Sequence, residues 1–224
     1  IAGPGTGKTF TLVKRIAYLV SEKKVNPSEI MVVTFTEKAA KELLTRISNE
    51  FLKIDLNINM NEMYIGTFHS VCLRLLKENS EYVAEDNKSR MMDAFEQTYL
   101  VCKNIENFNR LPGFTKHFPA TRGTWNQAVE ICRYVNQMME ELVDVDAMIE
   151  DQDEDIRFLG KLVTRYKELL DRNGAMDFSS IQTKTFEMLK QYPDVLQRIQ
   201  SDIRYIMVDE YQDTNYIQEQ LVFL

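Results

Sequence analysis

The sequence predicts an α/β fold in which a parallel-sheet domain is interrupted by an inserted all-helical subdomain. Two observations lead to this prediction. Apolar runs of strand length alternate with helical periodicity over residues 1–76 and 176–224, which is typical of a doubly wound parallel sheet. Residues 77–175 show helical periodicity and loops but no convincing strand, so they are expected to form a separate subdomain.

The composition is that of an ordinary globular protein. Of 224 residues, 44% are hydrophobic and 27% are charged, and no apolar run approaches membrane-spanning length, so no membrane partner is expected. The net charge of −7 argues against a protein that coats nucleic acid electrostatically, although a local basic groove is compatible with it. The three cysteines are unclustered, which fits free thiols in a reducing cytoplasm and excludes a four-cysteine iron–sulfur site within the chain.

The first nine residues match a phosphate-binding loop. Glycines allow successive backbone N–H groups to point toward an anion, and the helix that follows adds its positive end. Lys8 is expected to reach the β- and γ-phosphates of a nucleoside triphosphate, and the Thr9 hydroxyl to hold Mg²⁺. Ala2 stands where a glycine is usual and is treated as a variant. The alternative interpretation is a glycine-rich turn before an ordinary helix.

The elements that follow alternate in type. A helix is expected from Lys8 to Glu22, and a buried strand from Ile30 to Phe35. A second short strand, Met63–Phe68, is expected to lead into a helix over residues 69–77. Between the two strands Thr36 is expected to cap a helix, whose buried stripe would consist of Ala40, Leu43, Leu44, Ile47 and Phe51.

The middle segment carries two long amphipathic patterns, Asn126–Val143 and Ile156–Leu170. Between them residues 144–155 form an acidic stretch without Lys or Arg. A solvated connection between helices is the favoured interpretation of this stretch, and a metal or partner site is the alternative. His117 is expected in a loop without an assigned role, and Trp125 in the core.

The α/β pattern then resumes, with a helix over residues 177–189 and an apolar strand, Tyr205–Val208, that ends in an acidic pair. Such a strand delivers its acids to the carboxyl edge of the sheet, where the phosphate loop also opens. Asp209 is therefore predicted to hold Mg²⁺, and Glu210 to orient and deprotonate an attacking water. An acidic pair after a strand is a weak signal alone, and the upstream phosphate loop makes it strong.

Four ordered segments resemble the motifs of the superfamily 1 DNA helicases related to UvrD, Rep and PcrA. Ala2–Thr9 is similar to their motif I, which commonly carries Ala at this first position, and Val208–Asn215 is similar to motif II. Val33–Ala40 resembles motif Ia, with Glu37 where Asn is more usual, and Gly66–Ser70 resembles motif Ib. The resemblance covers essentially the whole chain.

The resemblance implies a P-loop (RecA-like) motor domain, residues 1–76 and 176–224, with residues 77–175 as its inserted helical subdomain. Ala175–Phe178 is similar to the segment with which the family re-enters its first motor domain. Lys8 and Glu210 would be catalytic. Thr9 and Asp209 would bind Mg²⁺, and the residues implied to bind ATP are Ala2, Gly3, Pro4, Gly5, Thr6, Gly7, Lys8, Thr9, Phe10 and Gln212.

In the family, motifs Ia and Ib line a track for single-stranded DNA. The residues implied to contact nucleic acid are Phe35, Thr36, Lys38, Thr67, Phe68 and His69. Core packing at strand ends is an equal alternative for Phe35 and Phe68, and His69 is alternatively a capping or core residue.

The predicted function is that of an ATP-dependent DNA helicase motor fragment, which in the full-length protein translocates on single strands and separates strands at junctions or duplex ends. Only Ile1 and Ala2 precede the glycines, and Leu224 lies inside an apolar helical pattern, so the chain is expected to be a fragment. An adenine-reading segment and the second motor domain would lie outside it, which leaves the fragment nearly inactive alone. The alternatives are the motor of a helicase–nuclease and a nucleotide-switched binding module that unwinds nothing.

Overall fold

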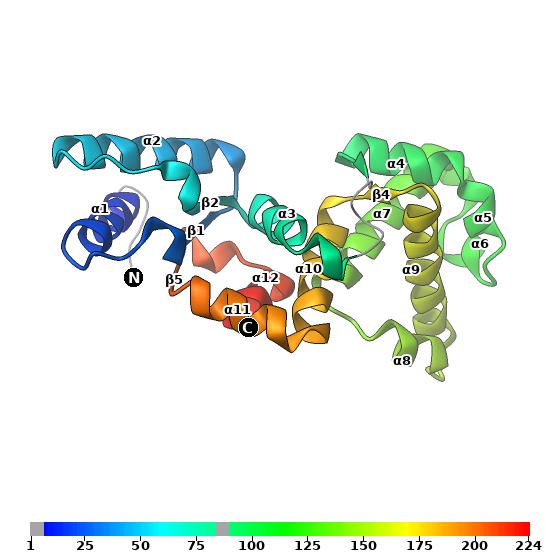
Figure 1. Cartoon of the computed structure of the whole chain (residues 1–224). Helices are drawn as coiled ribbons and strands as arrows, with labels where there is room; N and C mark the ends of the chain where they lie inside the picture. Colours follow the sequence, from blue (N-terminus) through cyan, green and yellow to red (C-terminus); the bar gives the residue numbers. More distant parts are fainter. Residues whose placement is uncertain (1–6, 84–89) are drawn as a thin grey trace. The chain divides into compact units, whose positions relative to one another are not determined.

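The computed structural model describes residues 7–83 and 90–224, which form two compact units (Figure 1). One unit consists of the described residues of Ile1–Asn79, Glu187–Thr214 and Gln218–Leu224, and the other of those of Ser80–Phe186 and Asn215–Ile217. The predicted boundaries place residues 176–186 with the sheet domain, whereas their contacts group them with the second unit.

The first unit contains a parallel sheet, whose strand order among the described residues is β2-β1-β5. Strand β1 (Ile30–Thr34) pairs with β2 (Tyr64–Thr67) on one side and with β5 (Tyr205–Val208) on the other. The register sets Thr34 opposite Thr67 and Val33 opposite Val208, so the three strands end at one edge. All three predicted strands are confirmed, with ends that differ by at most one residue.

Both faces of this sheet are covered by helices. Ile30 and Val32 pack in one apolar cluster with α1 and α2, whereas Met31 and Val33 pack in another with α3 and α11. Successive side chains of a strand point to opposite faces, so a strand buried on both sides is apolar throughout. The helices of this unit are α1 (Lys8–Ser21), α2 (Glu37–Lys53), α3 (Phe68–Glu78), α11 (Pro193–Asp202) and most of α12 (Tyr216–Phe223).

Side-chain caps explain where two of these helices begin. Thr36 Oγ1 accepts the Ala39 N–H at 3.1 Å at the start of α2, which confirms its predicted role. Thr67 Oγ1 accepts the Ser70 N–H at 3.2 Å at the start of α3, so the cap is Thr67 and not His69. The predicted stripe of α2 is buried except for Leu44, which is 38% exposed.

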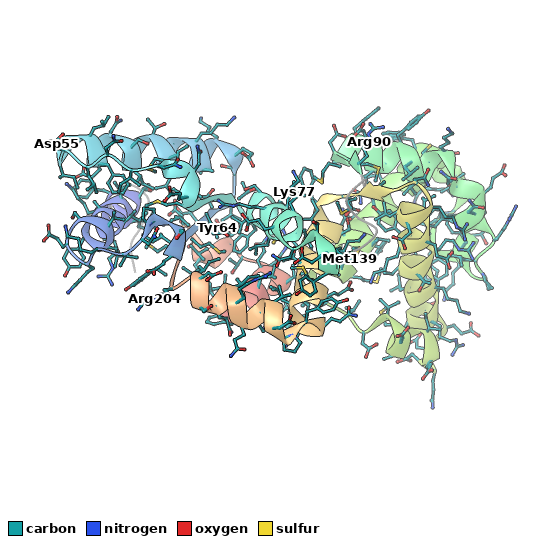
Figure 2. All side chains as sticks on the ribbon, viewed as in Figure 1. Asp55, Tyr64, Lys77, Arg90, Met139 and Arg204 are labelled. Carbon is teal, nitrogen blue, oxygen red and sulfur yellow. The ribbon has the colours of Figure 1, made fainter. Side chains whose placement is uncertain are left out.

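The second unit is mainly helical. Its helices are α4 (Ala94–Lys103), α5 (Ile105–Asn109), α6 (Phe114–His117), α7 (Thr124–Glu140), α8 (Val145–Glu150), α9 (Glu154–Arg172) and most of α10 (Phe178–Gln191). Its core lies between them and includes Met139 of α7, labelled in Figure 2. Short 3-10 turns complete the two units at Pro27–Glu29, Met60–Glu62, Ser80–Tyr82, Ala120–Arg122 and Tyr211–Asp213.

The prediction that this segment has no strand is wrong. Strand β3 (Arg90–Met91) pairs in parallel with β4 (Ala175–Met176), so the two ends of the segment are hydrogen-bonded to each other. Two-residue strands are too short to produce an alternating pattern, and the sequence therefore gives no sign of them.

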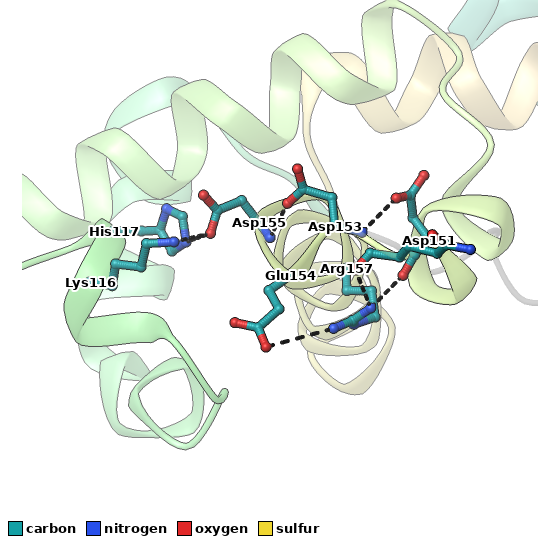
Figure 3. Close-up of polar contacts among 8 residues, drawn as sticks. Lys116, His117, Asp151, Asp153, Glu154, Asp155 and Arg157 are labelled. Carbon is teal, nitrogen blue, oxygen red and sulfur yellow. Dashed lines mark hydrogen bonds and ion pairs between the residues drawn. The ribbon is translucent and has the colours of Figure 1, made fainter.

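The acidic stretch is more ordered than a simple connection between helices. Asp144 caps α8 by accepting the Ala147 N–H at 3.0 Å, and Asp153 caps α9 by accepting the Asp155 N–H at 2.8 Å (Figure 3). Within the residues that the structure describes, no group of three or more His, Cys, Asp or Glu side chains is arranged to hold a metal ion. Asp144 and Asp153 thus serve as helix caps, and Glu154 and Asp155 as ion-pair partners.

Two residues of this unit differ from their predicted environments. His117 ends helix α6 and stacks on Phe158, with ring centroids 4.4 Å apart. Its Nε2 lies 3.2 Å from Asp155 Oδ1, and Lys116 pairs with the same carboxylate (Figure 3). Trp125 is 40% exposed and packs against Phe95 on the surface, so the prediction of a core tryptophan is wrong.

A buried polar network joins several helices of the second unit. Tyr166 on α9 is fully buried and donates its hydroxyl hydrogen to Asp177. Gln97 Nε2 on α4 lies 2.8 Å from the Tyr166 hydroxyl, 2.9 Å from Asp177 Oδ2 and 2.8 Å from Asn136 Oδ1 on α7. Asp177 Oδ1 also accepts the Ser180 N–H at 2.7 Å, at the start of α10.

Two further properties concern the cysteines and the helices of the described residues. Cys72, Cys102 and Cys132 are free thiols. No helix in residues 7–83 and 90–224 has the length and apolar character needed to cross a membrane.

Candidate nucleotide and nucleic-acid site

The described part of the phosphate loop is its junction with α1. Gly7 caps this helix with φ 89°, a left-handed conformation that glycine adopts without a steric penalty. The first turn of α1 carries no acidic residue, so the positive end of the helix is not neutralised from within. The predicted nucleotide-binding residues Ala2, Gly3, Pro4, Gly5 and Thr6 lie outside the described residues.

The acidic pair is positioned by the end of strand β5. The Asp209 N–H continues the ladder by donating to the Val33 carbonyl oxygen at 2.9 Å. Glu210 then adopts φ 54° and ψ 46°, a left-handed conformation that is uncommon for a residue with a side chain. The chain therefore turns sharply between the two acids and enters the 3-10 turn Tyr211–Asp213.

Lys8 and Glu210 meet although 202 residues separate them in sequence. Lys8 Nζ lies 2.6 Å from Glu210 Oε2, and the Gln212 amide donates to the same oxygen at 2.6 Å. The Lys8 ammonium, followed by the Gln212 amide, lowers the pKa of Glu210, so this carboxyl group is ionised at neutral pH. The ion pair remains in contact with water, because the two side chains are 33% and 43% exposed.

These residues line an open pocket of about 590 Å³, within the usual size range of small-molecule sites. Asp209 and Gln212 also line it, which brings four of the predicted site residues together. The lining also includes four residues that the sequence did not predict: Thr11, Leu12, Arg15 and Tyr211. A signal for the first three existed, since they follow Lys8 at helical spacings of 3, 4 and 7 and so share its face of α1.

Two predicted residues of α1 are not part of the described lining. Thr9 is half-buried in the first turn of the helix, and Phe10 is 61% exposed with Lys14 Nζ 5.4 Å from its ring centroid.

Helix α1 is anchored to α2 by a carboxylate that the sequence analysis also missed. Glu50 is only 7% exposed, and its Oε1 lies 2.5 Å from Lys14 Nζ, while Lys53 lies 3.6 Å from Oε2. The hydrogen bond from Lys14 lowers the pKa of Glu50. Its position in the sequence could have indicated this burial, because Glu50 follows Ile47 by three residues and so lies within the apolar stripe of α2. The ion pair links the helix of the phosphate loop to its neighbour.

The residues predicted to contact nucleic acid lie at the ends of β1 and β2, at the same edge of the sheet. Thr67 is the last residue of β2 and is only 5% exposed. The rings of Phe35 and Phe68 pack edge to face, with centroids 6.0 Å apart. Phe68 is 5% exposed and belongs to the core cluster beneath the sheet, whereas Phe35 is half-buried. Thr36 and Lys38 are exposed.

Comparison with known proteins identifies the family. The family model for the UvrD/REP helicase N-terminal domain matches residues 1–224. The chain belongs to this family. It is 33% identical over 220 residues to DNA helicase II of Haemophilus influenzae, 30% identical over 224 residues to ATP-dependent DNA helicase PcrA of Staphylococcus aureus, and 32% identical over 238 residues to ATP-dependent DNA helicase SRS2 of Saccharomyces cerevisiae.

The alignments cover 97% to 100% of this chain but only 28%, 29% and 19% of those three relatives. The chain thus spans less than a third of the length of the curated relatives that it matches. Membership of the UvrD/REP family confirms the predicted α/β class, and the parallel sheet flanked by helices on both faces agrees with it.

Within this UvrD/REP-type domain, the structure gives different environments to the two predicted aromatic contacts. The buried ring of Phe68 fits the core-packing alternative, because it lies among Met31, Val33 and Val71. Phe35 is only half-buried, so base stacking stays a prediction for this residue. His69 is half-buried, between the cap of α3 and the rest of that helix.

Proposed function

We propose that this chain is the ATP-binding part of a helicase motor that moves along single-stranded DNA. The observation that carries the proposal is the meeting of Lys8, Asp209 and Glu210 at one pocket on the carboxyl edge of a parallel sheet. The names of the relatives support the same activity for the longer protein, since each is called a DNA helicase.

The donor set fits Mg-ATP. A hydroxyl from Thr9 and a carboxylate from Asp209 are oxygen ligands of the kind that Mg²⁺ prefers, and Lys8 provides a cation for phosphate oxygens. When bound, Mg²⁺ neutralises negative charge on the phosphates. Asp209 would be held in place by the hydrogen bond from its own N–H to Val33, so its carboxylate starts from a fixed backbone position.

Lys8 has two competing anionic partners in this proposal. In the structure it pairs with Glu210, and we expect phosphate oxygens to take the place of this carboxylate when nucleotide binds. Glu210 then keeps the Gln212 amide as a neighbour and is available to orient a water and accept its proton. Gln212 acts as a positioning residue for Glu210, because its amide can donate to the carboxylate but cannot take up a proton.

The DNA strand would run along the ends of β1 and β2. Thr36 and Lys38 offer exposed donors for phosphates, and the accessible part of the Phe35 ring offers a surface for a base. The chain has a net charge of −7, so we expect few phosphate contacts and therefore weak, salt-sensitive and largely sequence-independent binding.

The test is single-strand-stimulated ATPase activity of the full-length protein. Glu210→Gln keeps the shape and hydrogen bonding of the side chain but removes its basicity, so we expect turnover to fall by about 10²–10⁴-fold with near-normal Mg-ATP binding. Asp209→Asn should weaken nucleotide binding and its Mg²⁺ dependence together. Glu22→Gln, at the far end of α1, is the charge-matched control and should leave both unchanged.

A Glu210→Gln protein with wild-type turnover would contradict the assignment of the base. ATP binding without any DNA-stimulated hydrolysis in the wild-type protein would instead favour a nucleotide-switched binding module.

A further inference from the structure

We propose that Glu37 competes with backbone phosphates for the Thr67 hydroxyl and thereby lowers the affinity of this domain for a nucleic-acid strand. The carboxylate holds the Thr67 hydroxyl, a donor predicted to contact the strand, and places a negative charge beside it. The inference rests on the proposed function, because it concerns the strand that would pass along the ends of β1 and β2.

The contact joins the segments that follow two neighbouring strands. Thr67 Oγ1 lies 3.3 Å from Glu37 Oε1, although the residues are 30 positions apart. The register brings them together, since Thr34 at the end of β1 stands opposite Thr67 at the end of β2. Glu37 is the first residue of α2, directly after the capping residue Thr36.

The hydrogen bonds of Thr67 direct its hydroxyl proton. Its oxygen accepts the Ser70 N–H at 3.2 Å, which fixes the side chain as the cap of α3. The proton then has two acceptors at 3.3 Å, Glu37 Oε1 and Ser70 Oγ. Ser70 Oγ donates its own proton to the Thr67 carbonyl at 2.9 Å and can still accept, so the preference rests on the carboxylate being the stronger acceptor. The proton therefore points to Glu37.

Glu37 also occupies a favourable place for an anion. It is exposed and lies in the first turn of α2, where the helix end stabilises negative charge. Thr67 is only 5% exposed, so a backbone phosphate could approach its hydroxyl only from the side of Glu37, where it would meet this charge. Carboxylate and phosphate are both anionic acceptors, so they cannot share the single Thr67 proton, and the phosphate must displace Glu37. Lys38, the next residue, carries the opposite charge and has the opposite effect on binding.

The consequence is a contact that is made and lost readily. A strand that must be released at each step of movement is helped by a site in which a protein anion returns as the phosphate leaves. Glu37 thereby sets the affinity of the track without contacting ATP.

The experiment measures binding of the full-length protein to a fluorescein-labelled oligo(dT) strand by fluorescence anisotropy. Glu37→Gln keeps the size and hydrogen-bonding atoms of the side chain but removes its charge, and we expect affinity to rise about three- to tenfold at ~0.1 M salt. The gain should shrink as salt is raised to ~1 M. Lys38→Gln should weaken binding under the same conditions.

Glu62→Gln is the matched control. Glu62 is an exposed acid that precedes β2 at the opposite edge of the same sheet, so its removal changes the net charge equally. It should leave affinity within twofold of the wild type. Circular dichroism of each variant checks that the fold is retained, which exposed substitutions should not disturb.

The outcomes separate this inference from the proposed function. Wild-type binding with no gain in Glu37→Gln, or with an equal gain in Glu62→Gln, would overturn the role of Glu37 and leave the proposed function standing. No binding by the wild type or any variant would overturn both. Binding by Glu37→Gln alone would support the inference.

Discussion

Replacing Tyr166 by Phe removes one hydroxyl from the buried network of the second unit and leaves the ring in place. Tyr166 is fully buried, and burial together with the neighbouring Asp177 carboxylate raises the pKa of its phenol far above the usual range. The hydroxyl therefore stays protonated and remains a donor. In the variant, Asp177, which is 2% exposed, loses that donor, and Gln97 loses one of its acceptors.

The magnitude follows from the charge of the acceptor. A hydrogen bond to a charged group contributes about 1.5–3 kcal/mol, and a buried carboxylate cannot replace it with bulk water. Asp177 keeps the Ser180 N–H and the Gln97 amide as donors, and we expect the free energy of unfolding to fall by about 1.5–3 kcal/mol. For a chain of this length that corresponds to a decrease in Tm of about 5–10 °C.

The assay is thermal and urea unfolding followed by far-UV circular dichroism. Tyr99→Phe is the control, because this tyrosine lies on α4 and is 56% exposed, and it should change stability by less than about 0.5 kcal/mol. If Tyr166→Phe unfolded within 0.5 kcal/mol of the wild type, the network would not hold these helices as argued.

Two further predictions concern burial. Phe68→Ala should lower the free energy of unfolding by about 3–5 kcal/mol, as measured by urea unfolding. Phe35→Ala, at a half-buried position, should lower it by less than about 2 kcal/mol and should weaken single-strand binding, as measured by oligonucleotide anisotropy. Equal losses of stability in the two variants would contradict the distinction. Burial raises the pKa of the Cys132 thiol to about 12, so in the folded protein at pH 8 it should react with Ellman's reagent far more slowly than the partly exposed Cys102, and comparable rates would refute this.

Much of the first unit could be predicted because its signals are local. The run over residues 30–33 is apolar at every position because both faces of β1 are buried, and such a run is visible without a structure. The hydroxyl of Thr36 and the acids after β5 are likewise tied to strand ends that the pattern defines. The residues that meet at the pocket from far apart, Lys8 and Glu210, could be paired only because each belongs to a motif.

The missed features depend on contacts that no short pattern encodes. Trp125 is a large apolar residue of the kind expected in a core, yet its position on α7 leaves it 40% exposed. Strand β3 is defined by its pairing with β4, which is 85 residues away at Ala175 opposite Arg90. The role of Glu50 depends on Lys14 from another helix. In each case the partner, and not the local sequence, determines the environment.

The position of β1 between β2 and β5 has a mechanical consequence. Because β1 is hydrogen-bonded along both sides, and the Asp209 N–H adds one more bond to Val33, the proposed ATP and DNA sites at the ends of these strands belong to one rigid sheet. Sliding one strand past another would break several of these backbone hydrogen bonds at once, so the sheet transmits force without deforming. Conformational change is therefore expected in the short segments beyond the strand ends. There Glu210 adopts a left-handed backbone, and Glu37 makes a contact that water can replace.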